Sequence, residues 1–192
     1  MKKFELTSET KINIFGKKLF RIKALISFAD VEAGETGGWV EKEGNVNQSG
    51  NAWVYGDAMV YGNAEVSGDA KVSGDAKVYG DAEVSGNAKV YGNAKVYGDA
   101  MVSGDAKVYG NAEVYGDAMV YGDADYTTIH GFGTQFRTTT FFRCKDKKVR
   151  VACGCFFGTI PEFREQVKNT RKGKIAEEYL MIADLMENHF EK

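Results

Sequence analysis

Proline, histidine and cysteine are scarce in this sequence, and each shortage narrows the fold or the chemistry. The 192 residues contain one proline, two histidines and three cysteines. An odd number of cysteines, all in the C-terminal third, argues against a disulfide framework and fits free thiols in a reducing cytoplasm. With only His130 and His189, a zinc site of three histidines is excluded. We expect neither a metal nor a cofactor.

Long apolar runs and an excess of positive charge are also missing. No apolar run approaches the roughly 18 to 20 residues that span a bilayer, and the N-terminus MKKFELTSETKINIF lacks the apolar segment of a signal peptide. The net charge is −2, so no overall basic field attracts a nucleic-acid backbone. We expect a cytoplasmic protein with no membrane partner, and nucleic acid is disfavoured as a partner.

Glycine, in contrast, is abundant and periodic. It stands at every sixth position without a break from Gly38 to Gly122, which makes fifteen hexads with no insertion. Alanine keeps its own phase over residues 52–124, and valine keeps its phase over residues 54–120. Val40 and Val46 stand in the alanine phase, so the register begins before the clean repeat.

Each hexad predicts one short strand and one corner. Alanine and valine two residues apart point to the same side of a strand, and the Gly and Asp or Asn that follow favour turns. Glycine at every sixth residue would cost a helix about 1 kcal/mol each time. Hairpins would break the phase of the apolar residues at each reversal. The unbroken phase therefore indicates a solenoid.

The spacing from Val60 to Ala64 and from Val66 to Ala70 resembles the hexapeptide-repeat family. The resemblance implies a left-handed parallel β-helix with three hexads per triangular coil, or about five coils over residues 38–125. The expected fold is thus mainly β. Residues 1–37 would form an N-terminal β cap, and residues 126–192 would form a C-terminal cap of strands and helices, because solenoid ends need covering.

Each cap has a predicted internal order. Residues 4–25 indicate strands around a turn at Gly16, with Phe15, Leu19 and Ile22 as apolar anchors. Residues 126–158 indicate further strands.

Two helices are predicted from Ile160 onward. Thr159 fits an N-cap and Pro161 fits the first turn. The second helix should bury one apolar face. That face comprises Tyr179, Ile182, Leu185 and Met186.

Steps of eighteen residues sort the outward side chains into three faces. The first face carries a tyrosine row, the second a lysine row, and the third a patch of low charge. These sets are Tyr61, Tyr79, Tyr97 and Tyr115; Lys71, Lys89 and Lys107; and Met101, Met119 and Tyr121. Valine and alanine should fill the interior, so any ligand must bind outside. The tyrosines fit either ordinary cross-strand neighbours or an interface, and the methionine patch is a second candidate interface.

Two classes of partner follow. Because hexapeptide-repeat proteins are commonly trimers, the resemblance implies a homo-oligomer, with a trimer favoured. The C-terminal cap is locally basic, which suits a small anionic ligand. The candidate anion-binding residues are Arg137, Arg143, Lys145 and Arg150.

No catalytic residue is predicted. Acyltransferases of the hexapeptide-repeat family use a histidine, often on a loop that protrudes from a coil, but both histidines here follow the last coil. Cys144, Cys153 and Cys155 fit buried structural thiols best. A zinc site with His130, or a nucleophilic cysteine with His130 as its base, stays open as a weaker alternative.

A narrower resemblance covers nearly the whole chain. The segments LFRIKAL and GGWVEKEGNV, the VYGDA and VYGNA hexads and VACGCFFGTIPEF are similar to repeat proteins often encoded in phages, prophages and gut bacteria. This resemblance implies a non-catalytic binding or scaffold protein in a bacterial host cell, such as a counter-defence protein that sequesters a host protein or a nucleotide signal. The alternative is an acyltransferase-like enzyme with an atypical site in the C-terminal cap.

Overall fold

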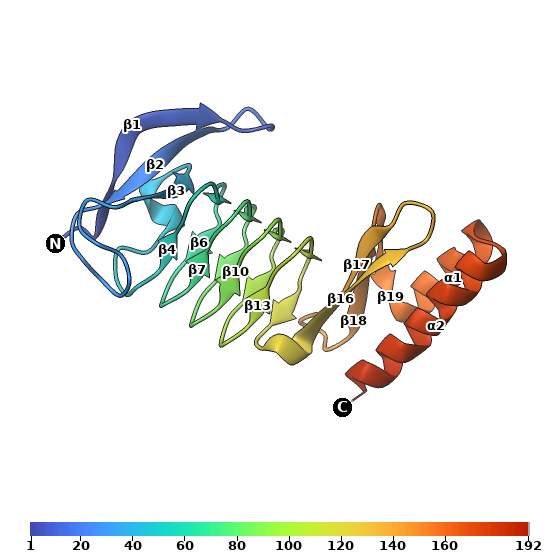
Figure 1. Ribbon diagram of the computed structural model, residues 1–192. Helices are drawn as coiled ribbons and strands as arrows, with labels where there is room; N and C mark the ends of the chain where they lie inside the picture. Colours follow the sequence, from blue (N-terminus) through green and yellow to red (C-terminus); the bar gives the residue numbers. More distant parts are fainter. Residues whose placement is uncertain (192) are drawn as a thin grey trace.

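A parallel β-solenoid of five turns forms the centre of the computed structural model, which describes residues 1–191 (Figure 1). Its turns are built from strands of two residues joined by tight corners. These strands are β4 (Trp53–Val54), β5 (Met59–Val60), β6 (Glu65–Val66), β7 (Lys71–Val72), β8 (Lys77–Val78), β9 (Glu83–Val84), β10 (Lys89–Val90), β11 (Lys95–Val96), β12 (Met101–Val102), β13 (Lys107–Val108), β14 (Glu113–Val114) and β15 (Met119–Val120). The predicted fold, mainly β with a cap at each end, is confirmed.

Three parallel sheets run along the solenoid. One contains β5, β8, β11 and β14, the second contains β4, β7, β10 and β13, and the third contains β6, β9, β12 and β15. Each residue pairs with the residue eighteen positions further on, as Lys77 does with Lys95. The sorting of the outward side chains into three faces is therefore correct.

Valine and alanine fill the interior, and glycine forms the corners. Every repeat alanine and valine from Ala52 to Val120 is fully buried. The corner glycines of successive turns stack on one another. At Gly86, φ is +64°, and an added Cβ would lie 2.9 Å from the backbone nitrogen of Gly104. Both the backbone angle and the close stacking therefore require glycine at this corner.

The first turn departs from the predicted register. Val40 pairs with Val60 and Val46 with Val66, which is an offset of twenty residues instead of eighteen. Gly38 consequently lies beside the carbonyl of Ala58, in the place that alanine takes in later turns. The expectation that no insertion interrupts the hexads is wrong here, because two additional residues lie in the corner before Asn51, whose N–H donates to Gly68 in the later register.

The N-terminal cap extends one sheet of the solenoid. β1 (Phe4–Ile12) and β2 (Lys18–Ala24) form a hairpin, and β2 pairs antiparallel with β3 (Thr36–Val40), which in turn pairs with β5.

The first turn is sealed around Trp53. This ring holds an outward position beside Lys71, yet Phe4 and Phe28 cover it edge-on at 5.9 and 5.4 Å. Leu19 and Ile22 are buried as expected. Phe15 is 62% exposed, so its expected role as a core anchor is wrong; it follows β1 at the hairpin tip, outside the first turn.

The C-terminal cap is an antiparallel sheet covered by two helices. The strands are β16 (Tyr126–Phe132), β17 (Arg137–Arg143), β18 (Val149–Cys153) and β19 (Phe156–Thr159), and the helices are α1 (Ile160–Thr170) and α2 (Gly173–Phe190). Neighbouring residues of β17 point to opposite sides of the sheet. Phe142 joins the solenoid core, whereas Phe141 packs with the helices. The sheet lies between the solenoid and the helices (Figure 1).

The helices begin and pack nearly as predicted. The Thr159 hydroxyl accepts a hydrogen bond from the Glu162 backbone N–H, which confirms the N-cap, and Pro161 lies in the first turn. In α2, Tyr179, Ile182 and Met186 are buried. Leu185 is exposed and lies off this face, so its predicted burial is wrong. No helix of residues 1–191 is long and apolar enough to cross a membrane.

Candidate functional site

The tyrosine row forms a continuous stack of rings along one face. Ring centroids of successive tyrosines lie 5.0, 4.8 and 4.7 Å apart from Tyr61 to Tyr115, and neighbouring rings are nearly parallel. This spacing matches the distance between adjacent strands, because each tyrosine follows a strand of the same sheet. We call this set of four tyrosines the tyrosine ladder.

Both caps contact the tyrosine ladder at its ends. The Phe15 ring lies 6.4 Å from Tyr61 and 6.2 Å from Tyr79, while Phe157 lies 4.6 Å from Tyr115. Burial raises the pKa of Tyr61 and of Tyr115 to about 12. The ladder therefore stabilises the solenoid and joins it to both caps.

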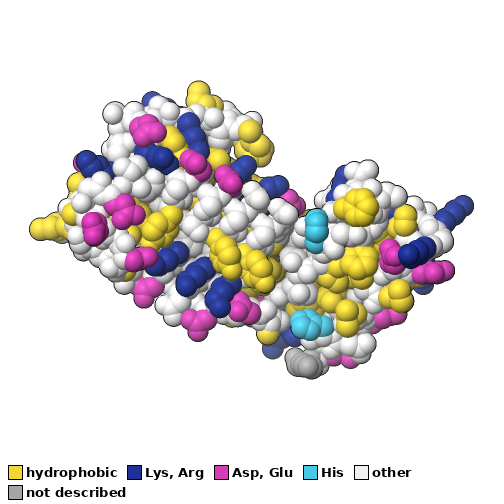
Figure 2. All heavy atoms as spheres, viewed as in Figure 1, with side chains coloured by type: hydrophobic (Ala, Val, Ile, Leu, Met, Phe, Trp, Pro, Cys, Tyr) yellow, Lys and Arg dark blue, Asp and Glu magenta, His cyan; other side chains and the backbone are white. Residues whose placement is uncertain are grey.

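A hollow lies at each end of the ladder sheet. At the N-terminal end, Ile12 and Ile14 of the hairpin and Met59 of β5 line a cavity of about 160 Å³. At the C-terminal end, Glu113 of β14, His130 and Phe136 line a cavity of about 510 Å³. Figure 2 shows the molecule hollowed between its two ends, which both rise above the solenoid. The face is thus concave, with apolar side chains at both borders.

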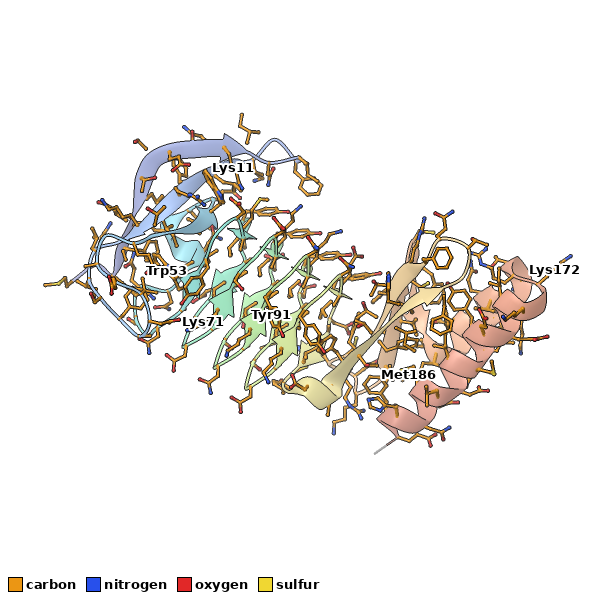
Figure 3. The ribbon with its side chains drawn as sticks, viewed as in Figure 1. Lys11, Trp53, Lys71, Tyr91, Lys172 and Met186 are labelled. Carbon is orange, nitrogen blue, oxygen red and sulfur yellow. The ribbon has the colours of Figure 1, made fainter. Side chains whose placement is uncertain are left out.

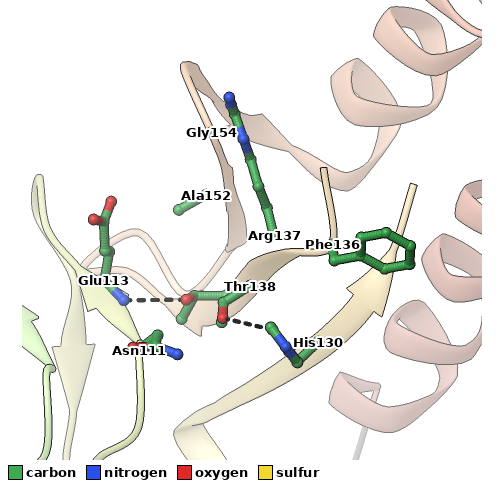
Figure 4. Close-up of a pocket in the computed structure, with 9 residues that line it drawn as sticks. Asn111, Glu113, His130, Phe136, Arg137, Thr138, Ala152 and Gly154 are labelled. Atoms are coloured by element: carbon green, nitrogen blue, oxygen red, sulfur yellow. Dashed lines mark hydrogen bonds between the residues drawn. The ribbon is translucent and has the colours of Figure 1, made fainter. Parts of the chain in front are cut away.

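The larger cavity is lined by His130 and Thr138, which lie side by side, and by Glu113, whose carboxylate points away from His130 (Figure 4). His130 Nδ1 lies 3.2 Å from Thr138 Oγ1, and the Glu113 backbone N–H donates to Thr140 Oγ1 at 3.2 Å. In the described part of the chain His130 has no carboxylate partner. A histidine bonded to a hydroxyl group can bind a polar ligand, but this arrangement lacks the carboxylate that orients a general base.

The other two faces differ in charge. Lys71 and Tyr91 mark the lysine face in Figure 3, where Lys71 pairs with Asp30 at 2.6 Å and Lys107 with Asp123 at 3.6 Å. Two of its three lysines are thereby neutralised.

The third face carries the methionine patch. Met101 and Met119 are register partners, and Tyr121 beside them is 50% exposed. We keep the name methionine patch for these three residues.

The four predicted anion-binding residues do not form one site. Arg143 pairs with Asp125 at 3.4 Å and donates to the Phe190 carbonyl, and Arg150 pairs with Asp146 at 2.8 Å. The Lys145 side chain is exposed at the solenoid end, where its backbone N–H donates to the Asp117 carbonyl. Only Arg137 lines the cavity described above.

The three cysteines lie in different environments. Cys144 is buried, and desolvation together with the nearby Asp117 raises its pKa to about 12. Cys153 is half-buried and accepts a hydrogen bond from Thr139 at 3.2 Å, whereas Cys155 is exposed. The prediction of buried thiols is therefore right for Cys144 and wrong for Cys155. Among residues 1–191, no three His, Cys, Asp or Glu side chains gather in an arrangement that could hold a metal ion.

Sequence reasoning missed the apolar residues that border the tyrosine ladder. Ile12, Ile14 and Phe157 are not among the binding residues that the sequence predicts, and Phe15 is expected in the core. The segment INIFG carries a signal for this exposed border. Its apolar residues stand directly before the turn glycine, at the tip of a hairpin, where no later strand covers them.

Comparison with known proteins supports the repeat architecture. The family model of the YdcK beta solenoid repeat matches residues 52–68 and 94–110. No curated protein matches the sequence significantly. The matched segments lie within the stacked strands β4–β6 and β11–β13 and the corners that join them. The chain is therefore a β-solenoid repeat protein, with repeats similar to those of YdcK.

Proposed function

We propose that the protein is a non-catalytic binding scaffold that sequesters or inhibits a host factor in the cytoplasm of a bacterium infected by a phage. The VYGDA and VYGNA hexads and the closing CGCFFGT segment support the phage context by resemblance. The spacing of an aliphatic residue and a small residue four positions later supports assignment to the hexapeptide-repeat family, whose coils are left-handed.

One observation carries this proposal: Phe15 is a large exposed aromatic residue that the tyrosine ladder holds in place. Its side chain is 62% exposed, although its ring contacts both Tyr61 and Tyr79. Rigid aromatic side chains contribute strongly to protein interfaces because little conformational entropy is lost on binding. Ile12 and Ile14 extend the same apolar border. The proposed partner is a host protein whose surface fits the concave face between the caps.

Introducing negative charge at the hairpin tip should abolish capture of this partner. The double variant Ile14→Glu with Phe15→Glu places two carboxylates on exposed positions and leaves the buried anchors Leu19 and Ile22 intact. We expect a protein retained by the tagged parent from a bacterial lysate to decrease at least tenfold with the variant, measured by quantitative mass spectrometry.

Met181 supplies a matched control for this experiment. It is an exposed apolar residue of α2 in the other cap, so Met181→Glu should retain the same host protein as the parent. Equal retention by all three proteins, or no host protein retained specifically by the parent, would contradict the proposed role of the concave face.

We also propose that the protein assembles as a homotrimer through the methionine patch. Phe15 and Phe157 stand on the tyrosine ladder and hinder the close approach of a second flat face. The methionine patch offers apolar side chains in register, and methionine adapts to irregular surfaces. Sedimentation should show trimers for the parent and monomers for Met101→Glu with Met119→Glu, because like charges would be buried across a symmetric interface.

The matched variant for assembly is Tyr79→Glu with Tyr97→Glu, which alters the tyrosine ladder instead. It should remain trimeric wherever circular dichroism shows it folded. A monomeric parent at tens of micromolar would refute self-association, and dissociation of the tyrosine variant alone would move the interface to the tyrosine ladder.

An acyltransferase-like enzyme remains the second candidate function. The observation in its favour is that His130 lines a cavity large enough for a small substrate at the C-terminal cap. A rise in the thermal midpoint with acyl-CoA alone, absent in His130→Ala, would favour this enzyme over the binding scaffold.

A further inference from the structure

A second cavity lies within the C-terminal cap. It has a volume of about 350 Å³ and is enclosed by the loop before β17, the turn between β18 and β19, and residues of α1 and α2. Its apolar wall consists of the rings of Phe156, Phe163 and Tyr179, with centroid distances of 5.5 Å from Phe156 to Phe163 and 5.8 Å from Phe163 to Tyr179. This wall suits a flat apolar group.

The polar wall of this cavity is positively charged. Arg137 and Arg171 both line it, together with Gln135, Gln166 and uncharged neighbours, and no lining residue is acidic. Guanidinium groups bind phosphate and carboxylate groups through paired hydrogen bonds. The cavity therefore combines an aromatic wall with two sites for negative charge.

These two arginines differ from every other arginine of the chain. Arg21, Arg143, Arg150 and Arg164 each form an ion pair with a carboxylate at 3.8 Å or less. Within residues 1–191, the Arg137 side chain has neither a hydrogen bond nor an ion pair, and the Arg171 side chain bonds only the neighbouring carbonyl of Thr170. The two arginines without a carboxylate partner thus line the same cavity.

Two glycines allow the side chains of this cavity to take their positions. At Gly154, φ is +62°, and an added Cβ would collide with Nη1 of Arg137. At Gly133, φ is +70°, and an added Cβ would meet the hydroxyl group of Tyr179. That hydroxyl donates to the Phe132 carbonyl at 3.3 Å. The backbone is therefore shaped so that Arg137 and Tyr179 lie close to the loop and the turn that carry these glycines.

We infer that this cavity binds a nucleoside monophosphate, with the phosphate group between Arg137 and Arg171 and the base against the aromatic wall. A volume of about 350 Å³ lies within the range of small-molecule sites. The glutamine side chains at the border can donate to and accept from the edge of a base. Arg137 also lines the larger cavity at the border of the concave face, but nucleotide binding here does not depend on capture of a host protein.

Calorimetric titration tests the site with AMP, GMP, CMP and UMP, and with adenosine and inorganic phosphate as partial ligands. We expect at least one nucleotide to bind saturably, and to bind more tightly than adenosine or phosphate. Arg137→Gln and Arg171→Gln should each weaken that nucleotide roughly tenfold or more, because each removes charged hydrogen bonds.

Lys168→Gln and Lys172→Gln are the charge-matched controls. Both lysines are exposed near the junction of α1 and α2 and neither lines the cavity, so the affinity should change less than twofold (Figure 3 labels Lys172). An equal loss of nucleotide affinity in the lysine and arginine variants would show that only the overall charge matters, and it would contradict the proposed site.

A chemical readout places the ligand independently of affinity. Cys153 and Cys155 line the cavity, so the bound nucleotide should slow alkylation of the exposed Cys155. Absence of binding by all four nucleotides to the folded protein overturns the inference. Unchanged alkylation at saturation, or phosphate binding as tightly as every nucleotide, does the same.

Discussion

Gly86→Val should lower the stability of the solenoid by about 2 to 4 kcal/mol, whereas Lys89→Glu should change it by less than about 0.5 kcal/mol. Gly86 has φ of +64°, a conformation that a β-branched residue adopts only under strain. Its Cβ position is also 2.9 Å from the Gly104 nitrogen and 3.1 Å from the Gly104 oxygen. Lys89 is exposed and has no ion-pair partner among the described residues. Midpoints of denaturant unfolding measure both effects.

Gly110 separates the two causes of this loss. It has the same backbone conformation, with φ of +67°, but no atom lies within 4 Å of its added Cβ. Gly110→Val should therefore show the strain alone and fall between the other two variants. Equal midpoints for Gly86→Val and Lys89→Glu would contradict the assignment of the glycine column as stacked corners.

The repeat could be predicted because its determinants are local. Two apolar positions and one corner recur in each hexad, so strand, turn and direction of the side chains follow from six residues at a time. The register of the first turn was harder to predict. Gly38 and Gly44 keep the glycine phase, but Gly38 occupies an alanine place once Val40 pairs with Val60. The phase of Val40 and Val46 was the available signal for this shift.

The caps and cavities could be predicted only in part because they depend on contacts between distant residues. Trp53 is buried by Phe4 and Phe28, and nothing local to Trp53 indicates this covering. Arg137 and Arg171 come from different elements, and sequence grouped Arg137 with Arg143 and Arg150 by proximity along the chain. Asp125 of another segment neutralises Arg143, and Asp146 in the adjacent turn neutralises Arg150. The folded arrangement, not the number of basic residues, decides that Arg137 and Arg171 are the arginines without a carboxylate partner among the described residues.

Alkaline pH should unfold the protein through the tyrosine ladder. Burial raises the pKa of Tyr61 and Tyr115 to about 12 and also raises the pKa of Tyr79 and Tyr97. In the unfolded chain tyrosine ionises near pH 10. Above that pH the unfolded chain has released protons that the folded ladder still holds, so stability is lost as the pH rises from about 10 through 12.

Lys3 has the opposite effect on the free energy of unfolding, and its effect begins at a lower pH. Burial lowers its pKa to about 8, while its ammonium group donates to the Ala52 carbonyl at 2.8 Å. Because the unfolded chain binds this proton more readily, the Lys3 contribution increases stability as the pH rises from about 8 to 10.5. The raised pKa of Cys144 opposes this gain, because its thiol ionises near pH 8.5 in the unfolded chain. We therefore expect the free energy of unfolding to change little up to pH 10 and then to fall steeply.

Removing the hydroxyl groups of two ladder tyrosines measures how much of the loss of stability above pH 10 comes from the tyrosine ladder. Tyr79→Phe with Tyr97→Phe keeps the stacked rings, so its advantage over the parent should grow above pH 10 by up to about 1.4 kcal/mol per pH unit for each tyrosine replaced. Tyr121→Phe, at a half-exposed position of the methionine patch, is the control. Denaturant unfolding from pH 8 to pH 12 measures the difference. Parallel pH curves for the parent and the ladder variant would show that the tyrosines do not govern alkaline unfolding. A growing advantage would show that the partly buried, protonated tyrosines of the ladder stabilise the face that bears Phe15.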